Sequence, residues 1–192
     1  MPAIYPQAKL TTVAFFPANY FLENLVVRAD NSALITAMNH TELWYVPPAP
    51  ATESVKPILL HTFEQLTLNL VEVEPDVVYL TTSNVYTDHK SSLHRIDLRN
   101  WNAGDPIQPQ KVLDFPNEAR ALNGSCLIGP RTILVADSVA GLIWRIDSAE
   151  KPLFSFSIGL RTVAATSAMF VNRETLTCYG ATTSRRWFVL RP

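Results

Sequence analysis

The 192-residue sequence lacks several features that would point to common functions. It contains only two cysteines, Cys126 and Cys178, and six glycines. Its net charge is −1, and it has no run of basic residues. Each cysteine lies in an expected strand, which favours a small buried apolar residue over a disulfide or a reactive thiol. The balanced charge predicts that neither nucleic acid nor an anionic membrane surface is a partner.

Long apolar and helical stretches are missing too. No run approaches the roughly 18 apolar residues of a membrane span, and the opening MPAIYPQAKL lacks the apolar core of a signal peptide. We therefore expect a cytoplasmic protein. No stretch of ten or more residues has the period of an amphipathic helix, which favours an all-β chain. The sequence has no GxSxG, no phosphate-binding glycine loop and no HxH or HxxxH spacing, so a zinc site is not expected.

What the chain does contain is a repeat, clearest in LNGSCLIGPRTILVADSVAGLIWRID, from Leu122 to Asp147. Each unit has an origin, then an apolar four beginning nine residues later, then a polar pair and a further strand. The origins are Asn24, Asn69, Asn123 and Ile158, and the apolar fours are ALIT, VYLT, TILV and SAMF. The polar pairs or near-pairs are Met38-Asn39, Ser83-Asn84, Asp137-Ser138 and Asn172-Arg173.

A period of roughly 35 to 55 residues with several short strands is typical of β-propeller blades. We therefore predict a single β-propeller domain over 1–192, with units at about 20–63, 66–116, 120–157 and 158–192. The fourth unit is degenerate, and its first strand is expected at Leu160–Ala164. Residues 11–17 are a candidate ring-closing strand, because they resemble the predicted outer strands. The four units could close alone, stay open or be completed by a second chain.

Four stretches resemble the SMP-30/gluconolactonase-like β-propellers, and more closely their fungal secondary-metabolism branch. They are LENLVVRADNSALIT, VEVEPDVVYL, LNGSCLIGPRTILVADSVAGLIWRID and FVNRETLTCY, which lie within Thr11–Tyr179. The segment ADSVAGLIWRID is the most specific. The resemblance implies a shortened relative of six-bladed rings. In the fungal branch, some members are hetero-Diels–Alderases that hold a quinone methide against a terpene alkene, whereas other relatives are metal-dependent lactonases.

Loops that enter the first strand and leave the second strand of each propeller blade open around one mouth of the central channel. This predicts one cluster of site residues. The set is Glu23, Asn24, Asn39, His40, Asn69, Ser83, Asn84, Asn123, Asp137, Ser138 and Asn172, and Phe21 stands beside it in the sequence. Convergent polar groups at the mouth of an apolar cavity are typical of a small-molecule site. The alternative is that Asn, Asp and Ser are simply good turn residues.

A cyclase of the fungal type needs no nucleophile, because it gains rate by holding both reacting groups close together. A hydrogen bond to an oxygen whose charge changes adds to the rate. The candidate donors are Asn24, Asn123, Ser83 and His40. The candidate substrate-binding residues are Phe21, Glu23, Asn39, Asn84, Asp137, Ser138 and Asn172. The candidate apolar walls are Phe21, Trp44, Tyr86 and Trp144, although aromatic residues in strands often belong to the core. We expect a small hydrophobic substrate and no cofactor.

Two alternatives remain. A lactonase of the family would hold a divalent cation such as Ca²⁺, and Glu23 and Asn123 stand where first-strand ligands are expected from the resemblance. The carboxylate of a later blade has no counterpart, because Ile158 opens the fourth unit, and Asp137 lies in a different loop. The second alternative is a non-catalytic binding module. A homodimer that completes the ring is a further expectation.

Overall fold

The computed structural model describes residues 10–50 and 52–147, and beyond them the strands Leu153–Phe156, Thr166–Asn172, Thr177–Thr182 and Trp187–Leu190. This described part forms four antiparallel sheets and contains no helix, and therefore none that could span a membrane. The first sheet consists of β1 (Leu22–Val27), β2 (Ala33–Ala37), β3 (Glu42–Val46) and β4 (Ile58–Thr62). The second consists of β5 (Leu66–Glu74), β6 (Val77–Ser83), β7 (Ser91–Asp97) and β8 (Gln110–Asp114).

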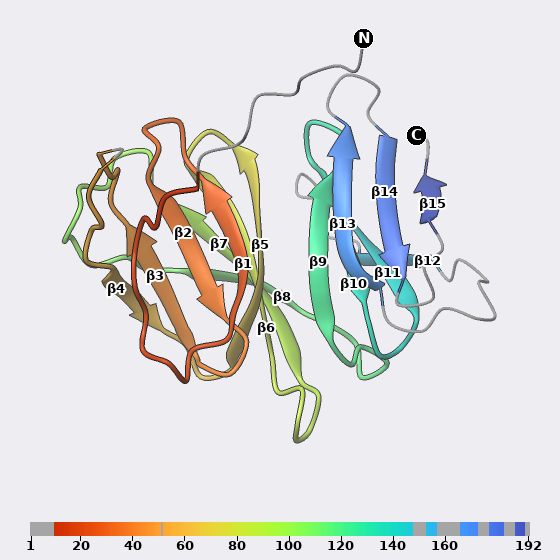
Figure 1. The fold of residues 1–192 in the computed structure, drawn as a ribbon. Helices are drawn as coiled ribbons and strands as arrows, with labels where there is room; N and C mark the ends of the chain where they lie inside the picture. The colour runs from red at the N-terminus through yellow and green to blue at the C-terminus, as the bar shows by residue number, and fades with distance from the viewer. Residues whose placement is uncertain are drawn as a thin grey trace, which may run out of the picture.

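The third sheet consists of β9 (Leu122–Leu127), β10 (Thr132–Asp137), β11 (Leu142–Asp147) and β12 (Leu153–Phe156). The fourth consists of β13 (Thr166–Asn172), β14 (Thr177–Thr182) and β15 (Trp187–Leu190). Within each sheet the strands pair in chain order, and the first strands β1, β5, β9 and β13 neighbour one another in succession (Figure 1). This is the arrangement of propeller blades around an axis. The predicted all-β propeller with four blades is confirmed.

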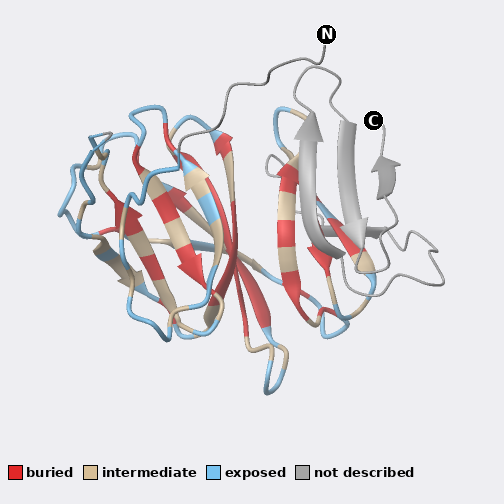
Figure 2. Ribbon diagram, viewed as in Figure 1, coloured by how far each residue is buried: buried red, intermediate tan, exposed pale blue. Residues whose placement is uncertain are grey.

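The hydrophobic core lies in the seams between neighbouring sheets. Strand β6 is buried along its whole length, because its alternate residues serve different seams (Figure 2). Val78 and Leu80 join the core shared with the first sheet, whereas Val77 and Tyr79 join the core shared with the third. A sheet covered on both faces explains why the strand reads as one apolar run instead of an alternating pattern.

Hydrogen bonds between sheets follow the sequence repeat. The Thr36 hydroxyl donates to the Leu68 carbonyl at 3.1 Å, and the Thr81 hydroxyl donates to the Leu122 carbonyl at 3.2 Å. Both threonines end the apolar four of their unit, and both acceptors immediately precede the next origin asparagine. The repeat therefore encodes the contact between blades as well as the strands within them.

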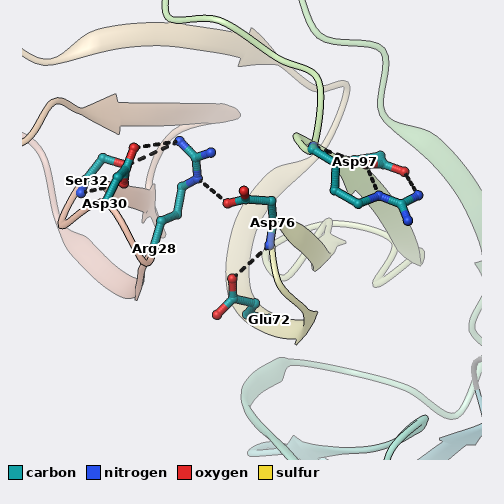
Figure 3. Close-up of polar contacts among 7 residues, drawn as sticks. Arg28, Asp30, Ser32, Glu72, Asp76 and Asp97 are labelled. Carbon is teal, nitrogen blue, oxygen red and sulfur yellow. Dashed lines mark hydrogen bonds and ion pairs between the residues drawn. The ribbon is translucent and has the colours of Figure 1, made fainter.

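The opposite end of the first seam is closed by a buried arginine (Figure 3). Arg28 Nε donates to Asp76 Oδ1 at 2.7 Å, which joins the β1–β2 turn to the β5–β6 turn. Its Nη1 donates to Ser32 Oγ, and Asp30 accepts from the Ser32 amide at 2.9 Å. Buried charge is tolerated here because the guanidinium is paired and hydrogen-bonded.

The structure differs from the predicted strand positions in the fourth unit, and it shows no strand in residues 10–17. The sequence predicts SAMF in the second strand of its unit. It lies instead in β13, the first strand of the fourth sheet. The prediction for this unit is therefore wrong by one strand. The strand expected at Leu160–Ala164 lies outside the described residues. Residues 10–17 form no strand, and Ala14 makes a single parallel bridge with Val55. Ring closure by 11–17 stays a prediction.

Candidate functional site

The strand order brings most of the predicted mouth residues to one end of the sheets. They lie at the starts of β1 and β9, at the end of β6 and in the turns after β2 and β10. Asn172 is the exception: it ends β13, which runs in the same direction as β9, and it pairs with Thr177 (Figure 1). Its backbone therefore lies at the other end of the sheets. The reason is that β13, and not residues 160–164, is the first strand of the fourth sheet.

Asp137 is a structural residue of the third sheet. Its side chain is buried, and its two oxygens accept from the amides of Arg120, Ala121, Val139 and Ala140 at 2.8 to 3.3 Å. Trp144 Nε1 adds a contact at 3.4 Å. Trp144 is likewise a core residue and not an exposed wall. The alternative of a turn residue describes Asp137 well.

The polar pair after β6 also has local partners. Ser83 is fully buried and accepts from the Ser91 hydroxyl at 2.7 Å. Asn84 Nδ2 donates to Asp88 at 2.9 Å, and this bond, with the Lys90 amide and ammonium, holds the pKa of the Asp88 carboxyl at about 2. The exposed Tyr86 lies in the same turn.

The asparagines of the first strands form hydrogen bonds between neighbouring sheets through their side-chain oxygen. Asn24 Oδ1 accepts from the Leu70 amide at 3.4 Å, and Asn69 Oδ1 accepts from the Ser125 hydroxyl at 3.0 Å. Because the oxygen is used in each bond, the NH₂ group of each amide is its remaining donor. Asn123 occupies the equivalent position in β9 and is partly exposed.

An aromatic cluster lies beside His40 on the first sheet. The imidazole stacks on Tyr20 with ring centroids 3.9 Å apart, and Phe16 and Trp44 complete the cluster. Glu42 fixes two of these rings by accepting from Tyr20 Oη at 2.8 Å and from Trp44 Nε1 at 3.0 Å. His40 Nε2 and His89 Nδ1 are buried without a hydrogen-bond partner in the described part of the chain, and of these two rings it is His40 that stacks on an aromatic side chain.

The turn that carries His40 is tied to the lead-in segment. Asn39 Oδ1 accepts from the Phe21 amide at 2.9 Å, and its Nδ2 donates to the Asn19 carbonyl. The Phe21 side chain remains 58% exposed beside this turn. Folding brings the Tyr20 ring, the candidate donor His40 and the exposed Phe21 side chain together. The sequence alone does not show this, because Tyr20 and His40 are far apart along the chain.

The candidate metal ligands among the described residues are dispersed. Across residues 10–50 and 52–147, histidine, cysteine, aspartate and glutamate side chains nowhere gather in a group of three suited to an ion. Both Asp137 oxygens are already engaged by backbone amides. Glu23 and Asn123 stand on β1 and β9, two strands separated by β5. This donor set gives no support to a metal-dependent step.

Sequence reasoning missed a pair of histidines on the first two sheets. His61 in β4 and His94 in β7 both line a groove over the seam of the first two sheets. The sequence shows no motif for this pair, because the residues come from different blades and meet through the seam.

Comparison with known proteins supports the architecture. No protein-family model matches the chain, and no curated protein matches it. A gluconolactonase from Xanthomonas campestris is similar in structure, with 11% identity and a TM-score of 0.62 over 89% of this chain and 57% of its own. The β-propeller domain of Cps50 (Swd1) from Myceliophteria thermophila matches at 9% identity and a TM-score of 0.61, over 91% of this chain and 55% of its own.

The chain has the β-propeller fold. A third similar structure is a catalytically inactive virginiamycin B lyase from Staphylococcus aureus with quinupristin, at 13% identity and a TM-score of 0.58, over 96% of this chain and 60% of its own. This chain thus spans 55% to 60% of the length of the three structures. At such low sequence identities the structural similarity establishes the fold alone. Any inference about activity must come from the residues of this chain.

Proposed function

We propose that this chain is a cytoplasmic cyclisation catalyst of fungal secondary metabolism, similar to a hetero-Diels–Alderase, that encloses a small hydrophobic intermediate derived from a polyketide or a terpenoid. One observation carries the proposal: His40, a predicted donor, has a buried unpartnered Nε2 beside the ring cluster of Phe16, Tyr20 and Trp44. An unpaired buried polar atom is costly, and a ligand oxygen would satisfy it.

The chemistry asks little of the protein. A pericyclic step forms its bonds in one event, so a rigid apolar surface accelerates it by holding diene and alkene in contact. The Tyr20, Trp44 and Glu42 hydrogen bonds hold the rings in place, and the exposed Phe21 extends the apolar surface. A donated hydrogen bond from His40 Nε2–H would stabilise charge that develops on the reacting oxygen. The NH₂ groups of Asn24 and Asn123 are further candidate donors.

The test uses an unstable quinone methide with a terpene alkene as substrates, in the presence of a chelator. His40→Leu keeps apolar contact with Tyr20 but removes the donor, so cyclisation should slow by about 100-fold. His40→Gln restores an N–H donor and should recover part of the rate. His89→Asn, in a turn of the second sheet, is the matched control and should leave the rate unchanged. Equal rates for His40→Leu and the unaltered chain would refute the role of His40.

The same assay separates the alternatives. Loss of activity in chelator, restored by Ca²⁺, would favour the divalent-metal lactonase, with Glu23 and Asn123 as its first candidates. Binding of a protein without any turnover would favour the non-catalytic module.

A further inference from the structure

A groove of about 720 Å³ lies over the seam between the first and second sheets, and its lining does not include His40 or the rings of Phe16, Tyr20 and Trp44. The β4–β5 link contributes Phe63 and Gln65, and the second sheet contributes Thr82, Ser92 and Phe115. Three of these residues are buried: Thr82 is 1% exposed, Ser92 7% and Phe115 7%. The volume is within the range of small-molecule sites. The function proposed above does not use this groove.

Two histidines flank one phenylalanine in the groove. The Phe63 ring makes edge-to-face contacts with both imidazoles, at 4.7 Å between centroids for His61 and 5.0 Å for His94. These three rings come from β4, from the link after it and from β7. They provide aromatic edges and faces that suit a flat aromatic ligand.

A chain of hydrogen bonds fixes the tautomer of His94. Gln65 Nε2 donates to the Lys90 carbonyl at 2.9 Å, so its Oε1 accepts from the Thr82 hydroxyl at 2.7 Å. Thr82 has only one hydrogen to give, and therefore its oxygen accepts from His94 Nε2 at 3.2 Å. The proton of the neutral ring is thus on Nε2. Nδ1 is left as an acceptor.

The imidazoles are neutral near pH 7. Burial lowers the pKa of His61, and burial together with Lys111 lowers the pKa of His94, while Asp114 opposes the effect. The two lysines at the rim are already paired, because Lys111 Nζ lies 2.9 Å from Asp114 and Lys90 Nζ lies 3.1 Å from Asp88. The exposed Glu64 also lines the groove and would disfavour an anion. Ser92 also donates to Asp114 at 2.7 Å. A charged ligand would have to break these pairs.

We propose that this groove binds a small uncharged aromatic molecule through a phenolic hydroxyl, which donates to His94 Nδ1 while the ring packs against Phe63. A phenol supplies the one donor that the locked imidazole lacks, and its ring suits the aromatic lining. Gln65 and Thr82 are positioning residues, because they act through the tautomer of His94.

The test is a nuclear magnetic resonance titration of the four histidine Cε1–H signals with p-cresol, and with toluene as the probe without a hydroxyl. We expect p-cresol to shift the His94 signal, and toluene to bind at least about tenfold more weakly. Binding should fade as the pH falls through the pKa of His94, which lies below the ordinary histidine value of about 6.5, because a protonated imidazole cannot accept. Equal affinity for toluene, or no shift of His94, would overturn the proposal.

Two variants keep the test decisive. Thr82→Val removes the lock without removing His94, and should weaken p-cresol binding while the toluene affinity stays the same. His94→Phe should abolish the preference for p-cresol over toluene. His89→Asn, outside the groove, is the control. A preference that survives in both Thr82→Val and His94→Phe would show that another group binds the hydroxyl.

Discussion

At the scale of single residues, the Asp137 carboxylate holds the β10–β11 turn and the Arg120–Ala121 segment together through four backbone amides. We predict that Asp137→Ala lowers the free energy of unfolding by about 3 kcal/mol, because several buried amides lose their acceptor at once. Urea unfolding measures the change, with the exposed Asp88→Ala as control. A loss below about 1 kcal/mol would show that the turn does not depend on this carboxylate.

Asp30 gives a pH-dependent prediction. The Ser32 hydroxyl and amide, with Arg28, lower the pKa of the Asp30 carboxyl in the folded chain. The stabilisation is therefore fully present above the unfolded pKa of about 4, and it is lost as the pH falls through the lower folded value. We expect the unfolding temperature of Asp30→Asn to fall less between pH 5 and pH 2.5 than that of the unaltered chain. Parallel curves would contradict this expectation.

At the scale of elements, the seams depend on Thr36, the last residue but one of β2, and on Thr81 within β6. Thr36→Val and Thr81→Val keep side-chain shape but remove the donors to Leu68 and Leu122. Each should cost about 1 to 2 kcal/mol of unfolding free energy, since both sites are buried. The exposed Thr62→Val on β4 is the matched control. If all three variants unfold alike, the seam bonds contribute no net stability.

The sequence predicted the strands of the first three sheets well, because the apolar fours are strong local signals. Cys126 is buried in β9 as expected. The fourth unit was misassigned by one strand, since Ile158 lacks the asparagine that marks the other origins. The partners of Asp137, Ser83 and Asn84 could not be foreseen: the same residue types suit a ligand site and a turn, and only the backbone geometry distinguishes them.

At the scale of the whole molecule, the first sheet has one face that no other sheet covers among the described residues. Leu25, Ile35, Trp44 and Leu59 are paired in register across β1 to β4, so they share this face. The row beside it, with Leu34 and Tyr45, is buried against the second sheet. Leu25 and Leu59 remain 58% and 45% exposed. Paired apolar residues that stay exposed are typical of an interface.

We therefore propose that a second copy of the chain covers this face and completes the ring around the His40 cluster, because Phe16 and Trp44 of that cluster pack on the same face. A blade from the partner would supply the apolar surface that the first sheet lacks. The Leu25→Glu variant should weaken this association, since it places a charge in the interface. Its unfolding free energy should stay close to that of the unaltered chain, because Leu25 is exposed within one copy.

The most direct measurement is the molar mass in solution by light scattering over a range of protein concentrations, with and without chelator. We expect twice the mass of one chain in both conditions, and the mass of one chain for Leu25→Glu. A single-chain mass at every concentration would contradict completion of the ring by a second copy, and association that appears only with divalent cations would favour the metal-dependent alternative.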